Sequence, residues 1–407
     1  IIIQKYYFMR IKFKIIFLSS LFSFILFIKA QSNSSLSERD GWKNLNLREK
    51  IGQTMVILGK YYDHKTFKGE GLKAFFEKYP IGGLFLPDWY YFYFAPKDSS
   101  MEYYIKESIK DYAANSRYPL IFMEDFERGL GLQYPESYTQ MPVEMALGAA
   151  GLEQLAYRYG QSIAKEARDF GMNWLLHPVV DLNMNPLHSL VLERSISDDP
   201  DFALPLLKKQ IAGLHSQDII TTIKHFPGDG ATIRDQHLMT SQNPLSWEEW
   251  QKTYGKVFKE LIAYEAPSIM VGHLIFPAYQ KEKFNGNLLP ASLSSELIIK
   301  LLKTEMNFNG VVISDALNMG GVAGYYANEL ETSIASFAAG VDLMLWPDLA
   351  FMDTLEARIL RKEIPMERLD DAVQRIWAVK ERFGLLRKPQ KLFLSLIHIS
   401  EPTRLRR

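Results

Sequence analysis

The chain contains no cysteine, carries no net charge and has a single long apolar run. Its 407 residues include 47 basic and 47 acidic side chains, which gives a formal net charge of +0. Without a charge excess or a long basic segment, nucleic acid is not expected to be the main partner. The lack of cysteine fits an oxidising compartment without requiring one.

The apolar run lies near the N-terminus and is typical of a signal peptide. Met9 is the expected start, a short basic segment follows it, 15–27 is apolar, and Ala30 precedes the expected cleavage. We therefore expect 1–30 to comprise a non-native start and a signal peptide. The mature chain, from Gln31, is expected to be exported to the periplasm or the exterior without stable membrane insertion. An uncleaved membrane anchor is the alternative.

The C-terminal end differs in character from the rest. Residues 395–407 resemble a translated sequencing adapter, and we expect the tail 390–407 to be foreign to the native chain. The intervening segment, 31–389, has about 350 residues, a length that fits one elaborated (β/α)8 barrel.

Short apolar runs recur along this segment, and segments with helical periodicity lie between most of them. One such helix is expected at 152–170, ended by Gly171, and a capping box at Ser246–Glu249 opens another. Alternating strands and helices predict parallel β-structure with right-handed crossovers. Eight strands favour an α/β fold of the closed (β/α)8, TIM-type barrel class, and a doubly wound open sheet is the alternative. The predicted strands are 54–58, 81–86, 120–125, 173–181, 219–224, 268–273, 311–315 and 341–346.

Polar side chains end several of the predicted strands. In a (β/α)8 barrel, active sites lie at the carboxyl ends of the strands. These side chains are therefore expected to surround one mouth. They are Asp125, Asp181, Lys224, His225, His273 and Asp315.

The most informative stretch is K-H-F-P-G-D-G, which begins at Lys224 and is followed by D-Q-H, from Asp235 to His237. Glycine and proline indicate a loop whose polar groups can converge on one site. A carboxylate beside an imidazole fixes its tautomer and raises its basicity, which suits proton transfer near neutral pH. The alternatives are an incidental surface loop or a metal site that includes His225 and Asp229. No regular ligand spacing supports a metal, so none is expected.

A second block reads G-V-V-I-S-D-A-L-N-M-G-G over 310–321. Its Asp315 ends an apolar strand. On the residues alone, this carboxylate is equally well explained as a catalytic group or as the N-cap of a following helix.

Together the two blocks resemble the signature of the β-N-acetylglucosaminidase branch of glycoside hydrolase family 3. The resemblance is to the N-terminal catalytic domain of that family and covers roughly residues 36–386 of this chain. The resemblance implies that Asp315 is the nucleophile, which traps an oxocarbenium-like centre as a covalent ester. It implies that His237, oriented by Asp235, is the acid/base in place of a second carboxylate. It assigns sugar-hydroxyl binding to Asp125, Arg194, Lys224 and His225.

The sequence departs from the family pattern at two positions. Gln133 stands where some members have a further binding arginine, and Asp229 stands where many have a second histidine. Arg128 is one candidate to replace the missing arginine. His177 and His188 are interpreted as structural.

The aromatic segment 89–94 follows the second predicted strand, and thus lies on the active-site side of a barrel. Its rings are expected either to stack on the C–H faces of sugars or to form a hydrophobic lid. The lid would pack on the barrel or on a C-terminal α/β domain, which many family members carry and which this chain would lack if truncated.

The resemblance implies a retaining exo-glycosidase that removes terminal β-linked N-acetylglucosamine, and the expected export points to peptidoglycan fragments or chitin oligosaccharides as its substrates. A carbohydrate is the expected partner, and no cofactor is expected. A β-glucosidase of the same family is the first alternative, and a non-catalytic saccharide-binding barrel is the second.

Overall fold

The structure, a computed structural model, describes residues 40–94 and 100–386. The chain divides into two units at residue 45, and the described part of the first unit is a short 3-10 turn, η1 (Gly41–Asn44). The expected signal peptide and the tail 390–407 lie outside the described residues, so both stay predictions. Within the described ranges, no helix has the length and apolar character needed to cross a bilayer.

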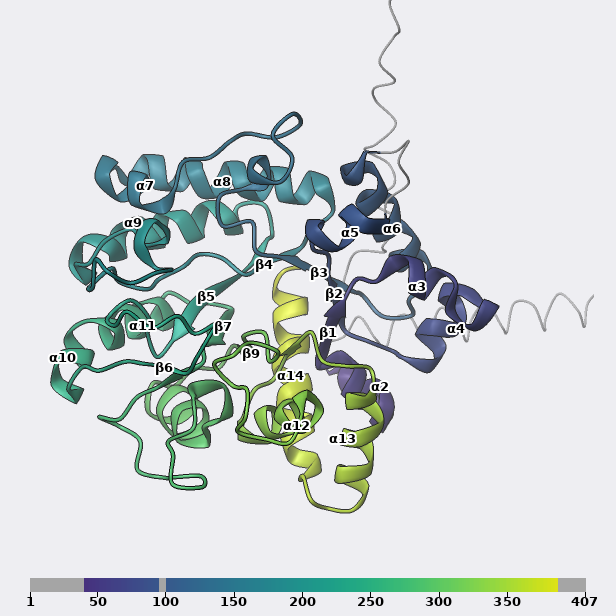
Figure 1. Cartoon of the computed structure of the whole chain (residues 1–407). Coiled ribbons are helices and arrows are strands. Elements are labelled where there is room, and N and C mark those ends of the chain that lie inside the picture. The colour runs from purple at the N-terminus through teal and green to yellow at the C-terminus, as the bar shows by residue number, and fades with distance from the viewer. Residues whose placement is uncertain (1–39, 95–99, 387–407) are drawn as a thin grey trace, which may run out of the picture. The chain divides into compact units, whose positions relative to one another are not determined.

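Parallel strands of the second unit form an eight-stranded sheet in chain order (Figure 1). The last strand along the chain pairs with the first. A parallel bridge between Ile313 and Leu343 joins the seventh strand to the start of the eighth. The sheet is therefore a ring, which confirms the predicted α/β (β/α)8 barrel and excludes an open sheet. The strands are β1 (Met55–Leu58), β2 (Gly83–Phe85), β3 (Ile121–Glu124), β4 (Trp174–Leu175), β5 (Ile220–Phe226), β7 (Ser268–Val271), β9 (Val311–Ser314) and β10 (Met344–Leu345).

Helices connect successive strands and surround the sheet (Figure 1). A small parallel pair, β6 (Ser241–Gln242) and β8 (Leu274–Ile275), lies outside the ring. The helical elements in chain order are α2 (Leu47–Gln53), α3 (Tyr61–Lys65), η2 (Phe67–Gly69), α4 (Gly71–Lys78), α5 (Asp88–Phe94), α6 (Met101–Asn115), η3 (Leu130–Leu132), α7 (Glu144–Ala150), α8 (Glu153–Phe170), η4 (Leu192–Arg194), α9 (Pro200–His215), α10 (Trp247–Lys252), α11 (Tyr254–Ala263), η5 (Ala291–Leu293), the π-helix η6 (Glu296–Glu305), α12 (Glu329–Ala339), α13 (Ala350–Leu360) and α14 (Met366–Arg382).

Local signals in the sequence explain several of these boundaries. The Ser246 side chain accepts a hydrogen bond from the Glu249 N–H, and the Glu249 side chain returns one to Ser246, so the predicted capping box is present. Gly171 ends α8 with a φ of 112°, a conformation that favours glycine. The fourth strand was predicted too long. Its ladder stops at Leu175, and Pro178 lacks the N–H that a longer ladder would need.

Strand periodicity fixes where the polar strand ends point. Inward-facing residues of the barrel core include Ile121 and Met123 in β3, Ile220 in β5, and Val311 and Ile313 in β9. Side chains alternate between the two faces of a strand, so every second residue further along the strand also faces inward. Continuing this alternation brings Asp125, Lys224 and Asp315 to the top of the core.

The opposite end of the barrel is closed by α14, whose Ile376, Val379 and Phe383 join the core cluster. The same helix carries Lys380, which is fully buried. Its ammonium group donates to the Gln53 side chain and to the backbone carbonyls of Gly82 and Pro119, which lie one and two residues before β2 and β3. The floor of the barrel is therefore sealed, and the mouth lies at the carboxyl ends of the strands.

Candidate active site

Asp315 follows β9 and lies at the top of the barrel core, with 13% of its side chain exposed. One carboxylate oxygen accepts a hydrogen bond from the Ala316 N–H at 2.8 Å, and the other lies 4.0 Å from His225 Nε2. Burial alone would raise the pKa of this carboxyl. The imidazoles of His273 and His225 and the Ala316 N–H outweigh burial, so the pKa of Asp315 lies below its usual value. Asp315 is therefore held as a carboxylate, the form that a nucleophile requires.

Four paired side chains near the ends of β3 and β5 form what we call the charged clamp: Asp125, Glu127, Arg194 and Lys224. Lys224 Nζ lies 2.7 Å from Asp125 Oδ1 and 2.6 Å from Glu127 Oε1. Arg194, from η4, donates two hydrogen bonds to the Glu127 carboxylate, at 2.8 and 2.7 Å. Burial disfavours the ionised Glu127, but Lys224 and Arg194 hold its pKa well below the usual range.

The clamp brings together three of the predicted sugar ligands: Asp125, Arg194 and Lys224. Burial would lower the pKa of Lys224, but Asp125 and Glu127 raise it, so the ammonium group stays charged. Glu127, the centre of the clamp, was not assigned a role from the sequence. Its signal was present, because it belongs to the same E-D-F-E-R-G segment as Asp125.

His225, the fourth predicted ligand, is fixed by Asp181. The two side chains meet at 2.7 Å between His225 Nδ1 and Asp181 Oδ2. The other Asp181 oxygen accepts the backbone N–H groups of His225 and Asp229, at 3.1 and 2.7 Å. Burial opposes ionisation of Asp181, but His225 and these N–H donors lower its pKa. The arrangement assigns the Nδ1 proton of His225 to Asp181 and leaves Nε2 directed toward Asp315.

Asp235 and His237 form a dyad on the loop after β5. Asp235 Oδ1 accepts the His237 backbone N–H at 2.8 Å and lies 2.9 Å from His237 Nδ1. The His237 side chain is 52% exposed. Gly320 and Gly321, on the loop that follows Asp315, anchor this turn, because their N–H groups donate to the His237 and Gln236 carbonyls at 2.7 and 3.0 Å.

His273 connects the dyad with the nucleophile. Its side chain is buried, with Nδ1 2.8 Å from Ser292 Oγ and Nε2 2.9 Å from the Ala316 carbonyl. Burial lowers its pKa most, and the charges of Asp315, His225 and His237 also act on it. The His273 backbone N–H donates to Gln236 Oε1 at 2.7 Å, so this residue contacts both the turn that carries the dyad and Ala316, the residue after Asp315.

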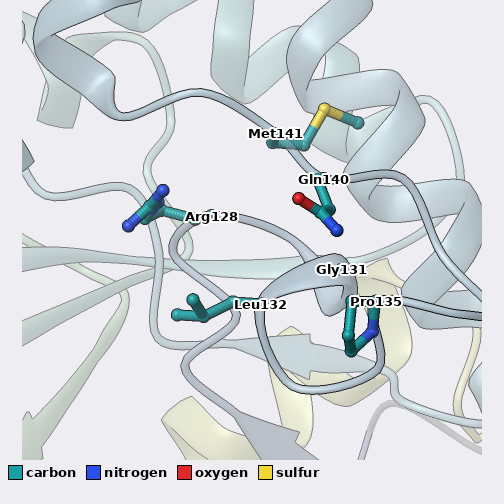
Figure 2. A pocket seen from close by; sticks show the side chains of 6 residues that line it. All are labelled: Arg128, Gly131, Leu132, Pro135, Gln140 and Met141. Atoms are coloured by element: carbon teal, nitrogen blue, oxygen red, sulfur yellow. The ribbon is translucent and has the colours of Figure 1, made fainter.

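One of the two family departures, Asp229, has a structural explanation. Asp229 pairs at 2.9 Å with the buried His188 beneath the loop, which fits the structural interpretation of His188. His177 is likewise buried, beside Gln210. Arg128 faces Glu193 at 3.9 Å and borders a pocket that includes no residue of the clamp. Figure 2 shows the six residues that line this pocket: Arg128, Gly131, Leu132, Pro135, Gln140 and Met141.

In the aromatic segment 89–94, Tyr91 and Trp89 differ in exposure, and a role in sugar stacking or as a lid stays a prediction. Tyr91 is buried and meets Ser108 at 3.1 Å, which fits a packing role. Trp89 is 51% exposed, and its ring lies 6.3 Å from that of Trp346 at the end of β10. The side chains of 92–94 lie outside the description. Within the described ranges, no group of three or more His, Asp or Glu side chains is arranged to hold a metal ion.

Comparison with known proteins assigns a family to this architecture. Residues 46–379 match the family model described as glycosyl hydrolase family 3 N terminal domain. A β-N-acetylglucosaminidase/β-glucosidase of Cellulomonas fimi is 34% identical over 278 residues, which cover 66% of this chain and 48% of that enzyme. The chain thus spans about half the length of this curated relative.

Two solved structures share the fold. One is described as a β-glucoside phosphorylase, BglX, bound to 2FGlc, with 26% identity, a TM-score of 0.74, and coverage of 88% of this chain and 62% of that one. The other is a family 3 β-N-acetylglucosaminidase from Paenibacillus sp. str. FPU-7, with 28% identity, a TM-score of 0.72, and coverage of 84% and 63%.

Proposed function

Because the chain belongs to glycosyl hydrolase family 3, as its two motifs predicted, we propose that it is a retaining exo-glycosidase that removes terminal β-linked N-acetylglucosamine. The observation that carries this proposal is that the loop after Asp315, whose pKa is lowered, is hydrogen-bonded through Gly320 and Gly321 to the turn that carries the Asp235–His237 dyad. A nucleophile and a separate proton carrier are the two groups that a double displacement needs.

In the first step, Asp315 attacks the anomeric carbon as the bond to the leaving oxygen breaks. His237 gives its proton to that oxygen. Asp235 engages Nδ1, which assigns proton transfer to Nε2 of His237 and stabilises the imidazolium. The products of this step are a free alcohol and a glycosyl ester on Asp315.

In the second step, the neutral His237 takes a proton from water, and the resulting nucleophile displaces the Asp315 carboxylate. Two inversions at one carbon restore the β configuration. A neutral imidazole adds no negative charge near the ester, whereas an ionised carboxylate in its place would repel the developing carboxylate of Asp315.

The charged clamp is suited to a polyol. Lys224 and Arg194 supply donors, and Asp125 supplies acceptors, in a partly desolvated mouth. The names of the relatives support N-acetylglucosamine as the sugar. We also propose that the protein is exported and acts on peptidoglycan fragments or chitin oligosaccharides, which rests on the expected signal peptide.

A β-glucosidase is the second candidate, because the name of the Cellulomonas fimi relative includes both activities. A panel of 4-nitrophenyl β-glycosides separates the two. We expect faster turnover of the N-acetyl-β-glucosaminide than of the β-glucoside, and the reverse order would favour the β-glucosidase. Running the panel with and without phosphate tests whether water is the acceptor.

The roles of the two catalytic groups are tested by substitution. Asp315→Ala should abolish turnover, and a 5-fluoro glycoside should label the Asp315 peptide in the unmodified protein. His237→Ala should slow unactivated leaving groups far more than 4-nitrophenyl ones, which need little protonation. Proton NMR should show the β-anomer first. An initial α-anomer, or label on another carboxylate, would contradict the proposed mechanism.

A further inference from the structure

The barrel mouth has two chemically different sides. The charged clamp occupies the strand ends of β3 and β5, with Arg194 contributed by η4. The neighbouring ends of β10 and β2 carry aromatic rings instead: Trp346 follows β10, Phe85 ends β2, and Trp89 begins the helix after β2. The catalytic steps above use the charged side and leave the aromatic side without a role.

Trp346 lies close to the proposed nucleophile in the barrel. The Leu345 N–H donates to Ser314 Oγ at 3.0 Å, and Asp315 is the next residue along β9. The Trp346 N–H donates to the Val56 carbonyl of β1 at 2.8 Å. These two bonds place Trp346 just above the ring of strands, between β9 and β1.

The backbone and the ring of Trp346 are both unusual. Its φ is +56°, a left-handed conformation that is rare for a bulky residue and is often found at functional sites. Its ring packs on Phe85 with centroids 5.0 Å apart. Its indole N–H is buried with no hydrogen-bond partner among the described residues, although such groups normally have one. Packing against the core explains the ring position but leaves the N–H unexplained.

Trp89 extends this aromatic surface outward. It is half exposed, and its ring meets that of Trp346 at an interplanar angle of 69°. Asp88, which precedes it, contributes charge to the environment of Glu124 at the end of β3. The start of α5 therefore lies beside the Trp346 ring, with the Asp88 charge acting on the end of β3.

We propose that Trp89 and Trp346 form an aromatic wall that contacts the apolar C–H face of the bound sugar while the charged clamp binds its hydroxyls. This inference rests on the proposed glycosidase function but not on the identity of the sugar. A pyranose has a polar rim and an apolar face, and the two sides of the mouth match those two surfaces. A small rotation of Trp346 on substrate binding would bring its free N–H to an acceptor oxygen of the sugar.

Binding measurements test the wall. The full chain carrying Asp315→Asn, which prevents turnover, is titrated by calorimetry with N,N′-diacetylchitobiose and with cellobiose. Adding Trp89→Ala should lower the affinity for whichever disaccharide binds by about three- to tenfold, the range expected for one aromatic contact. Trp89→Phe should recover most of the loss, and Trp346→Phe, which keeps a ring but removes the N–H, should weaken binding by a similar factor.

Tyr264→Ala is the matched control. Tyr264 is 41% exposed and caps the C-terminal end of α11. Its removal should leave both affinities unchanged, and thermal melting checks that every variant is folded.

The outcomes separate the two proposals. Binding of cellobiose alone, with the same loss in Trp89→Ala, would overturn the N-acetylglucosamine assignment and support the wall. Sugar binding that Trp89→Ala and Trp346→Phe both leave within twofold would overturn the wall and leave the glycosidase proposal standing. Binding of neither disaccharide would count against both.

Discussion

Replacing Glu127 with glutamine tests whether the charged clamp acts as one unit. The carboxylate of Glu127 neutralises both Lys224, which is 3% exposed, and Arg194, which is 26% exposed. Removing one partner of a buried ion pair typically costs about 3–5 kcal/mol, because it leaves an uncompensated charge. Asp125 remains beside Lys224 at 2.7 Å, so we expect a loss near the lower end, about 3 kcal/mol.

Urea denaturation at pH 7 measures this loss, provided that the denaturant dependence stays the same in all variants. The clamp is tested more sharply by a double-mutant cycle with Arg194→Met. If Glu127 and Arg194 act together, the double variant should lose at least about 1 kcal/mol less than the sum of the single losses. Affinity for the sugar should fall in all three variants, because each lacks Arg194 or the Glu127 carboxylate that holds Arg194 and Lys224 in place.

The control is Glu248→Gln, which breaks the exposed helix pair with Lys252. It should change stability by less than about 0.5 kcal/mol. Additive losses in the cycle, or a Glu127→Gln effect no larger than that of the control, would refute the argument that Glu127 organises the clamp.

Two further predictions concern buried titratable groups. Burial raises the pKa of Glu144 to about 8 from an ordinary 4.5, so between these values the folded chain holds a proton that the unfolded chain releases. The free energy of unfolding should therefore fall as pH rises through this window, by up to about 1.4 kcal/mol per pH unit. Urea titrations at pH 5 and 8 measure this fall, and Glu144→Gln should remove it. Equal pH slopes in the unmodified protein and the variant would contradict this prediction. Burial lowers the pKa of Lys380 to about 7 from 10.5, so the unfolded chain is the form that binds the extra proton above pH 7. Stability should rise from pH 7 to 9, and thermal melts of Lys380→Met should lack that rise; a rise of the same size in this variant would show that another group is responsible.

Sequence periodicity was sufficient to predict the architecture and the placement of part of the candidate site. Strand ends such as Ser314–Asp315 and Ile223–Lys224 are visible as apolar runs that stop at a charge. In a barrel, alternation then directs those charges inward, so Asp315, Lys224 and Asp125 could be expected around one mouth. The capping box at Ser246 and the glycine after α8 are local signals, and local structure followed them.

The missed residues depend on contacts between segments distant in sequence. Glu127 gains its role only because the chain turns at Phe126, with a φ of +40°, and meets Arg194 from another loop. Asp181 was visible as a strand end, but its partner His225 lies 44 residues later. No local pattern specifies such pairs, because their energy comes from burial and charge pairing that only the folded chain creates.

The family, the closed eight-stranded barrel and the candidate groups Asp315, Asp235 and His237 could all be predicted before folding was considered, because short motifs and strand periodicity are properties of neighbouring residues. The pairing of the buried charges, the lowered pKa of Asp315 and the contact between Trp89 and Trp346 could be found only in the folded chain. These features depend on distances across the barrel and on exclusion of water, and both exist only once the strands have closed into a ring.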